Sequence, residues 1–474
     1  LLLKKGLKVD TQNKKGSTAL IYATYYNDSP EIINVLVSKG ADVNKVNKEG
    51  FTPLIFAIIN KNGFDMVKTL LEKGADVNKA HPETGETPLI YAIKYRKDSK
   101  VAELLIENKA DVNAQDKNGV TPLIYAISTQ KDISLIKKLL EKGADANKKT
   151  NFGMTPIGYA VIFSKDPEIL KLLIQYGADP NIVYKNNMTL LMLASKYSNK
   201  EIVEYLLDNF DNINKTDKEG KTALMYAARF NPSKDVIKLL LQKGADIWAK
   251  DQNGKNSIDY AKQGKKRILD TLIKTYIDKL INTENIDEIK NLKERGIDVN
   301  YKDSSGTPLF MYILKKTDNK KILETLIEQG AEINVKNNAG ITPLMDAIIK
   351  GKNLDIINFL IKNKADVNVK DKAGKTALFY AVTRKDKDAL KIVKTLIKQG
   401  AEINIKDKYG ETPLMFALLS ANNLKIVEEL IKNGAKLEGK DILGRGIFDY
   451  INLNKDEKMR KILKDYIKKK MSKN

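Results

Sequence analysis

Apolar and polar residues follow the same order again and again along this chain. The clearest copy is TPLIYAI at 121–127, and similar copies recur at steps of 33 to 36 residues over most of the sequence. A repeat of this length is considered first because it decides the fold. Each copy opens with a threonine, or a looser match to one, at positions 18, 52, 87, 121, 155, 189, 222, 256, 307, 342, 376, 412 and 446.

Each copy predicts a pair of helices. Thr121 and Pro122 are residue types that begin a helix, because threonine can accept a hydrogen bond from an exposed amide and proline suits the first helical turn. Further on, apolar residues have the helical spacing of Ile136, Leu139 and Leu140, and a glycine then ends the second helix. One pair is too small to bury its own apolar side, so the copies must stack.

The segments between helix pairs carry turn residues. DKNG at 116–119 is typical, and such sequences predict β-hairpins. An asparagine also recurs at one position of most copies, as at Asn44, Asn78, Asn113 and Asn147. We interpret these asparagines as local hydrogen-bonding groups of the turn.

These motifs resemble the ankyrin repeat family. The family pattern, DxxGxTPLHxA followed by LLxxGADVN, is matched in about twelve units that cover nearly the whole chain. The resemblance implies an all-α repeat solenoid of helix-turn-helix units with β-hairpin fingers. It also implies a non-enzymatic scaffold that binds other proteins through its concave groove and hairpin tips. The histidine of the family pattern is replaced by residues such as Ile124 and Met225, so we expect looser coupling between hairpins and helices.

The period breaks between residues 262 and 306. Two helices are predicted there, at 265–282 and at 286–295, without the hairpin expected between them. We therefore predict two stacked arrays, residues 1–282 and 283–474, joined by a rigid helical junction. The alternative is one continuous array in which a single unit has lost its hairpin.

The two ends of the sequence have features of their own. The first array starts inside a repeat, from which we expect that an upstream segment was removed or left out. The last unit ends in an amphipathic helix over 456–469 with lysines on its outer side, as a capping repeat requires. Lys468, Lys469 and Lys470 are either a solvated tail or a contact with a membrane or nucleic acid.

The composition limits the kinds of catalytic, cofactor or metal site that the chain can form. The 474 residues include no cysteine, which excludes disulfides and thiolate metal sites, and a single histidine, His81, in a predicted turn. The sequence has no nucleophile–base motif, Gly-rich phosphate loop or metal-ligand cluster, so we predict no catalytic, cofactor or metal site. The alternative is that these repeats belong to a larger enzyme or effector whose catalytic part lies upstream of Leu1.

The positions that vary between copies are the better guide to function. The seventh and eighth positions after the opening threonine fall at the end of the first helix, where ankyrin proteins usually contact partners. Aromatic and basic residues, which are frequent at binding hot spots, gather there. The predicted partner-binding residues are Tyr25, Tyr26, Lys94, Tyr95, Phe163, Lys196, Tyr197, Arg229, Phe230, Lys315, Lys350 and Arg384. The alternative is that the rings only pack one helix against the next.

The predicted partner is another protein, and the net charge of +22 favours an acidic one. The composition also suggests an AT-rich bacterial genome, which would produce the same excess of lysine without such a role. Nucleic acid or another anionic surface, bound through the basic face, is the alternative partner. No apolar run is long enough to span a membrane. We expect a monomer, in the cytoplasm by default, with secreted and periplasmic locations left open.

Overall fold

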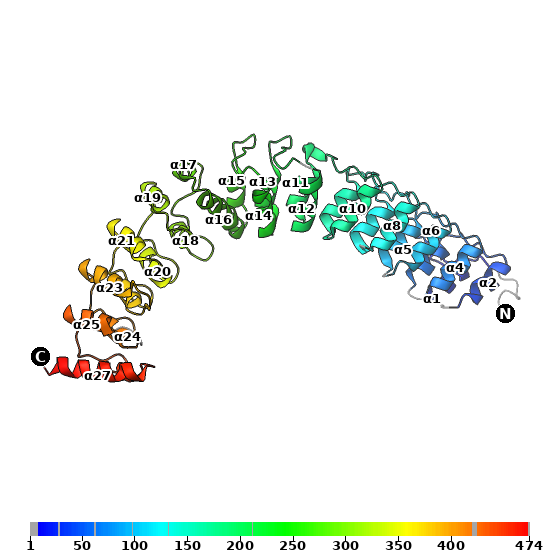
Figure 1. The fold of residues 1–474 in the computed structure, drawn as a ribbon. Helices are drawn as coiled ribbons and strands as arrows, with labels where there is room; N and C mark the ends of the chain where they lie inside the picture. Colours follow the sequence, from blue (N-terminus) through cyan, green and yellow to red (C-terminus); the bar gives the residue numbers. More distant parts are fainter. Residues whose placement is uncertain are drawn as a thin grey trace. The chain divides into compact units, whose positions relative to one another are not determined.

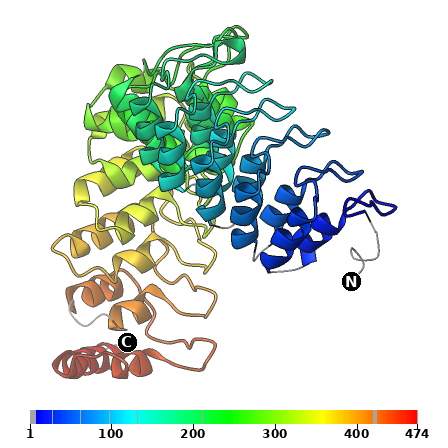
Figure 2. The ribbon, with the colours of Figure 1, turned by 90° about the vertical axis from the view of Figure 1, so that its right-hand side faces the viewer.

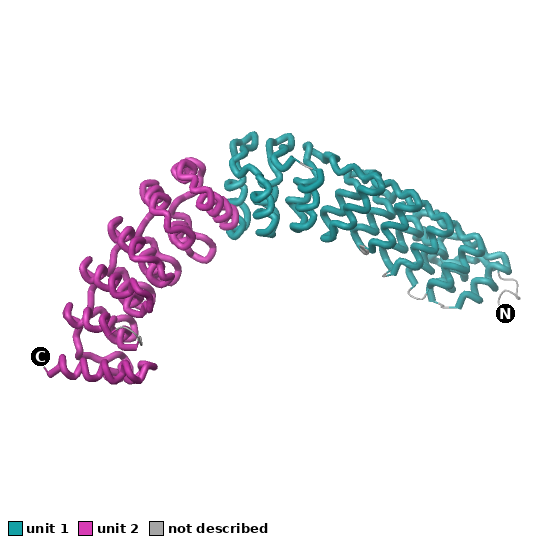
Figure 3. The backbone as a smooth tube through the Cα atoms, in the orientation of Figure 1, with its two compact units in different colours: residues 1–268 teal, residues 269–474 magenta. Residues whose placement is uncertain are grey.

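The structure is a computed structural model that describes residues 8–26, 29–60, 63–96, 98–130, 132–210, 212–419 and 424–472 (Figure 1). It divides into two compact units, residues 1–268 and 269–474, and each is described by itself (Figure 3). The division falls within one helix, α16. The two predicted arrays, with their boundary between residues 282 and 283, remain a prediction.

Unit 1 is a stack of helix pairs, in which we call the odd-numbered members first helices and the even-numbered members second helices. A π-helical turn, Ala126–Gln130, extends α7, and a 3-10 turn, Lys185–Asn187, precedes α11. The helices are α1 Ala19–Tyr26, α2 Glu31–Ser38, α3 Pro53–Ile59, α4 Phe64–Glu72, α5 Pro88–Tyr95, α6 Lys100–Glu107, α7 Pro122–Tyr125, α8 Ile133–Glu141, α9 Pro156–Phe163, α10 Pro167–Gln175, α11 Leu190–Tyr197, α12 Lys200–Asn209, α13 Ala223–Phe230, α14 Lys234–Gln242, α15 Ser257–Lys262 and α16 Lys266–Asn282.

Most of α16 belongs to unit 2, which then repeats this plan with even-numbered first helices and odd-numbered second helices from α18 onward. Its helices are α17 Ile286–Lys290, α18 Leu309–Lys316, α19 Lys320–Glu328, α20 Pro343–Ile349, α21 Leu354–Lys362, α22 Ala377–Ala381, α23 Ala389–Lys398, α24 Pro413–Leu419, α25 Leu424–Lys432, α26 Ile447–Asn452 and α27 Glu457–Met471. In each unit the loops between pairs project from one side of the stack (Figure 2).

The helices around the break in the period differ in part from the prediction. The predicted helix at 265–282 agrees with α16 to within one residue, and the predicted helix at 456–469 agrees with α27 to within two. The predicted helix at 286–295 is wrong in length, because α17 ends at Lys290 and turns follow. Asn291 is the first residue outside helical geometry, and asparagine favours turns over helix interiors.

The opening threonines begin helices as predicted. In eight copies the threonine Oγ1 accepts a hydrogen bond from the backbone N–H three residues on, at 3.2 to 3.5 Å. Proline is the first helical residue after Thr52, Thr87 and Thr121. Each such cap stabilises its helix by about 1 kcal/mol.

The core of each unit lies between its helices. Leu123, Ala126 and Leu139 are fully buried, as the apolar pattern predicted. First helices pack against the first helices of adjacent repeats, as α11 does against α13. Each repeat therefore depends on its neighbours to cover its apolar side.

The loops between repeats form turns. The described part of the chain contains no strand, so the predicted β-hairpin fingers are not confirmed. Isolated antiparallel bridges join Val183 with Thr189, Thr216 with Thr222 and Lys302 with Pro308. A carboxylate closes the typical turn: Asp116 Oδ1 accepts from the backbone N–H groups of Asn118 and Val120, both at 2.8 Å. Gly119 completes this turn at a φ of +75°, which glycine adopts without strain.

A tyrosine hydroxyl connects many of these turns to the following helix. The fourth position after the opening threonine is mostly aromatic, and the Tyr125 hydroxyl donates to Asp116 Oδ2 at 2.8 Å. Burial raises the pKa of Tyr125, and the Asp116 carboxylate raises it further, so the hydroxyl remains a donor. The equivalent bonds are Tyr226 to Asp217, Tyr260 to Asp251, Tyr380 to Asp371 and Tyr450 to Asp441.

The repeated asparagines bridge repeats, so their interpretation as local groups of the turn was wrong. Asn113 Nδ2 donates to the Gly143 carbonyl at 2.8 Å, and Asn113 Oδ1 accepts from the Asp145 N–H at 2.7 Å. Asn44 makes the same two bonds to Gly74 and Asp76. The Gly143 carbonyl follows a second helix, where backbone groups lack helical partners. Each such asparagine therefore satisfies backbone groups of the next repeat.

We predict that Phe416→Tyr stabilises the protein. Phe416 occupies the tyrosine position nine residues after Asp407, whose buried Oδ2 has no hydrogen-bond partner and lies 3.8 Å from Lys375 Nζ. A hydroxyl there would supply the missing donor and raise the free energy of unfolding by about 1 kcal/mol. Urea denaturation measures this change, and Tyr380→Phe should cost a similar amount because it removes the same donor from Asp371. A lower stability for Phe416→Tyr would contradict the proposed role of the hydroxyl.

Candidate functional site

Five aromatic residues of the predicted site are the last residues of first helices in unit 1. They are Tyr26 in α1, Tyr95 in α5, Phe163 in α9, Tyr197 in α11 and Phe230 in α13, and we call them the aromatic ladder. In α5, α9, α11 and α13, the residue that follows the ladder ring has an extended backbone conformation. No further helical turn therefore covers the ring. The exposed fraction ranges from 43% for Phe163 to 74% for Tyr26.

Most ladder rings are supported from within their own helix. Four of them stack on a ring four residues earlier, with centroids 5.5 to 6.4 Å apart and ring planes within 26° of each other. The inner ring can be almost completely buried: Tyr91 is 4% exposed, whereas its partner Tyr95 is 54% exposed. The stacked pairs are Tyr22–Tyr26, Tyr91–Tyr95, Tyr159–Phe163 and Tyr226–Phe230. The ladder rings are thus held in place while keeping a surface in contact with solvent.

Basic residues at the seventh position lie on these rings. Lys196 Nζ is 4.7 Å from the ring centroids of both Tyr197 and Phe230, which belong to adjacent repeats. The Arg229 guanidinium is 5.6 Å from the Phe230 ring and also donates to the Gln263 carbonyl. Within the described ranges, no carboxylate forms an ion pair with Lys196. This end of the ladder therefore combines exposed rings with an unneutralised positive charge.

Lys94 has a similar position but an internal partner. Its Nζ lies 5.3 Å from the Tyr95 ring centroid and 5.5 Å from that of Tyr125. The same Nζ is 2.6 Å from Glu86 Oε1, and the Glu86 side chain is 7% exposed. Burial opposes the charge of Lys94, but the bond to Glu86 outweighs it and raises the pKa of Lys94. Lys94 consequently offers less free charge than Lys196.

Lys315 and Lys350, the two lysines of unit 2 that are predicted to contact a partner, are exposed and lie near the carboxyl group of Asp346. Lys315 lies in the last turn of α18, and Lys350 follows α20. Burial raises the pKa of Asp346, and the positive charges of Lys350 and Lys315 partly oppose this shift. No aromatic residue ends α18 or α20, so this surface is basic without a ladder.

Arg384 has an internal role, which argues against its predicted contact with a partner. Its side chain is only 7% exposed, and Nε lies 2.7 Å from Asp386 Oδ2. Nη1 donates to the carbonyls of Lys352 at 3.0 Å and Ile348 at 3.4 Å, in the preceding repeat. Arg96 likewise donates to the Asn60 carbonyl at 2.7 Å. An arginine at this place connects helix ends of adjacent repeats, and we leave Arg384 out of the candidate site.

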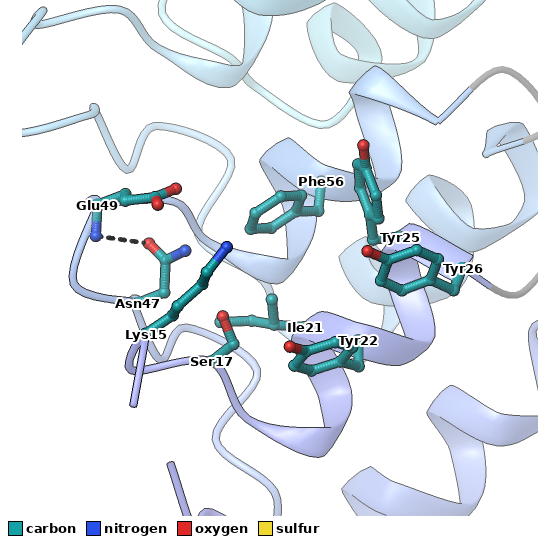
Figure 4. Close-up of a pocket in the computed structure, with 9 residues that line it drawn as sticks. All are labelled: Lys15, Ser17, Ile21, Tyr22, Tyr25, Tyr26, Asn47, Glu49 and Phe56. Atoms are coloured by element: carbon teal, nitrogen blue, oxygen red, sulfur yellow. Dashed lines mark hydrogen bonds between the residues drawn. The ribbon is translucent and has the colours of Figure 1, made fainter. Parts of the chain in front are cut away.

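A hollow of about 200 Å³ lies next to the ladder in the first two repeats (Figure 4). Tyr25 and Tyr26 line it together with Tyr22 from the same helix and Phe56 from α3. Tyr22 and Phe56 were not among the predicted site residues, because the aromatic fourth position was interpreted as packing between neighbouring repeats. In α3 this position reaches Tyr25, with ring centroids 5.4 Å apart, and its aromatic character is the signal that could have placed both rings in the site.

The remaining chemistry of the described residues is limited. His81 is 4% exposed, its Nδ1 accepts from the Glu83 backbone N–H at 3.3 Å, and its ring packs edge-on against Phe51. Across the described ranges, no group of three or more His, Cys, Asp or Glu side chains could hold a metal ion. None of the helices described is both long enough and apolar enough to cross a membrane.

Comparison with known families agrees with this geometry. A model of ankyrin repeats in three copies matches residues 1–81, 78–150, 157–251, 212–283, 261–371 and 344–441, and a model of many copies matches 128–174. The chain belongs to the ankyrin repeat family. Ankyrin repeats are generally protein-interaction modules, and the family is typically non-enzymatic. No curated protein matches the chain.

We predict that Arg384→Met destabilises the protein while Lys350→Met does not. Arg384→Met leaves two carbonyls and Asp386 without their donor, which costs about 1–3 kcal/mol. Lys350 is exposed, and substitutions at such positions usually change stability by less than about 0.5 kcal/mol. Urea denaturation of the two variants tests the assignment. Equal stability losses would mean that Arg384 does not connect the repeats.

Proposed function

We propose that this chain is a non-enzymatic scaffold that binds a protein partner, as a monomer, along the first-helix ends of unit 1. The supporting observation is the aromatic ladder, five half-exposed rings at equivalent helix ends of one stack. Rings already held by stacking lose little side-chain freedom when a partner covers them, and aromatic residues dominate binding hot spots. The turns between repeats also carry exposed rings, such as Phe152, which is 77% exposed.

The partner that fits this surface carries apolar and acidic residues. Apolar side chains would cover the ladder rings, and carboxylates would approach Lys196 and Arg229 at its end. The net charge of +22 would attract such a partner and speed its association, most strongly at low salt. Lys315 and Lys350 of unit 2 offer a second basic surface for the same kind of partner.

The length of the ladder sets the length of the partner segment. Neighbouring helix axes are typically 8–10 Å apart, so the six steps from α1 to α13 span roughly 50–60 Å. An extended chain advances about 3.3 Å per residue, so roughly 15 to 18 residues would reach from Tyr26 to Phe230. A peptide of 18 residues is therefore a suitable probe.

Binding of nucleic acid or another anionic surface is the second candidate. The observation that favours it is α27, in which seven of fifteen residues are lysine or arginine and two are acidic. Such a surface binds anions of many kinds, with an affinity that falls steeply as salt is added. A single-stranded oligonucleotide offered to the chain at low salt tests this candidate, and an absence of binding would reject it.

We predict that peptides selected from a random 18-residue library on the full chain are rich in apolar and acidic residues. Their affinity should fall roughly 100-fold in the triple variant Tyr95→Ala, Phe163→Ala, Tyr197→Ala, because truncating each hot-spot ring costs 1 kcal/mol or more. Dissociation constants from calorimetry measure the loss. The variant Val35→Ala, Ile133→Ala is the matched control, because both residues are exposed on second helices.

The selected peptides should bind the control variant as tightly as the original chain. Circular dichroism should show that both variants keep the helix content of the original. Equal affinity for the ladder variant, with that content preserved, would reject the proposed surface.

A further inference from the structure

One side of the hollow beside Tyr26 is made of aromatic rings, and the other side is lined mainly by polar residues of the turns. The Tyr25 ring stands at 83° to the Tyr26 ring, with centroids 4.6 Å apart, and at 82° to the Phe56 ring, 5.4 Å away. Tyr22 stacks beneath Tyr26 at 5.7 Å. Tyr22 and Tyr25 are each 45% exposed, so the ring surfaces are open to a ligand (Figure 4). We call Tyr22, Tyr25, Tyr26 and Phe56 the aromatic cage.

Three of the other four ladder rings carry a cation from the chain itself. The residue before the ladder ring is Lys94 in α5, Lys196 in α11 and Arg229 in α13, and each lies 4.7 to 5.6 Å from that ring. In α9 this residue is Ile162 and in α1 it is Tyr25, so α1 supplies a second ring where α5, α11 and α13 supply a charge. Among the residues that the structure describes, no lysine or arginine lies over a ring of the cage. The electron-rich faces of these rings are therefore not covered by any described lysine or arginine, although Lys15 also lines the hollow.

Two opposite charges flank the cage on the turns of the first two repeats. Glu49 lines the same hollow, and its backbone N–H donates to Asn47 Oδ1 at 3.1 Å. Lys15 lines the hollow as well, with its ammonium directed toward Phe56 (Figure 4), and both side chains are exposed. The carboxylate of Glu49 would attract a cation in the cage, and the ammonium of Lys15 would weaken that attraction. Removing the charge of Glu49 and removing the charge of Lys15 should therefore change the affinity for a cation in opposite directions.

We propose that the cage binds the guanidinium group of an arginine side chain from the protein partner, with Glu49 as the counter-charge. A guanidinium is planar, stacks on aromatic faces and pairs with a carboxylate, so it meets both features of this hollow. The inference rests on the proposed function and adds a direction to it. A partner segment would place its basic residue at α1 and α3, and its acidic residues near Lys196 and Arg229.

The experiment compares two small probes that differ only in charge. N-acetyl-arginine amide and N-acetyl-citrulline amide have the same shape, and ligand-observed NMR gives their dissociation constants on the full chain. We expect the arginine probe to bind roughly 2- to 30-fold more tightly, as a cation–π contact of ordinary strength allows. Equal affinities, or no binding of either probe, would overturn the proposal.

Variants identify the site of this preference. Tyr25→Leu with Tyr26→Leu keeps an apolar hollow but removes two ring faces, so the preference for arginine should disappear. Tyr95→Leu is the matched control, because it removes a ladder ring that already carries Lys94, and the preference should remain. Glu49→Gln should weaken binding of the arginine probe, and Lys15→Gln should strengthen it. A preference that survives the double variant would place the arginine site elsewhere.

A third probe separates the two kinds of occupant. N-acetyl-tyrosine amide binding more tightly than the arginine probe would mean that the hollow takes an aromatic side chain, which also overturns the proposal. These outcomes are independent of the triple ladder variant, which leaves Tyr26 and the other cage residues unchanged. If selected peptides lose affinity in the ladder variant but neither small probe binds, the cage assignment fails and the scaffold function stands.

Discussion

The structure depends on hydrogen bonds and apolar contacts that cross from one repeat to the next. A helix pair leaves backbone groups at its ends without partners and one apolar side uncovered, so it is incomplete alone. Asn113 satisfies backbone groups around Gly143 in the following repeat, and Arg384 satisfies carbonyls of the preceding one. Leu123 and its equivalents fill the space between the helices. These contacts fix how neighbouring helix ends stand beside each other.

This constraint separates the residues that build the stack from those that remain available to bind a partner. The opening threonine, the buried leucine and the bridging asparagine are used in nearly every copy. The residue that ends the first helix has no such internal role in α5 or α11, where Tyr95 and Tyr197 are half-exposed. Because the stack holds equivalent helix ends in a row, single rings become an extended surface. The aromatic ladder is thus a consequence of the repeat as well as of the residues at one position.

The sequence predicted the features that a repeat determines locally, and it was less successful where repeats meet. The stack, the threonine helix starts and the buried Leu123 follow from the pattern and are confirmed. The asparagines were misinterpreted, because a side chain's partner 30 residues away depends on how the repeats stack. The bonds of Arg384 to the preceding repeat were not foreseen for the same reason. The hollow beside Phe56 was not predicted, because the aromatic fourth position was interpreted as packing between repeats.

Hydrogen–deuterium exchange of the full chain, with and without a selected peptide, shows whether a partner is bound by the first-helix ends of unit 1. We predict slower exchange at the C-terminal turns of α1, α5, α9, α11 and α13, where a bound partner would cover the ladder. Slower exchange confined to the second helices or to α27 would contradict this prediction.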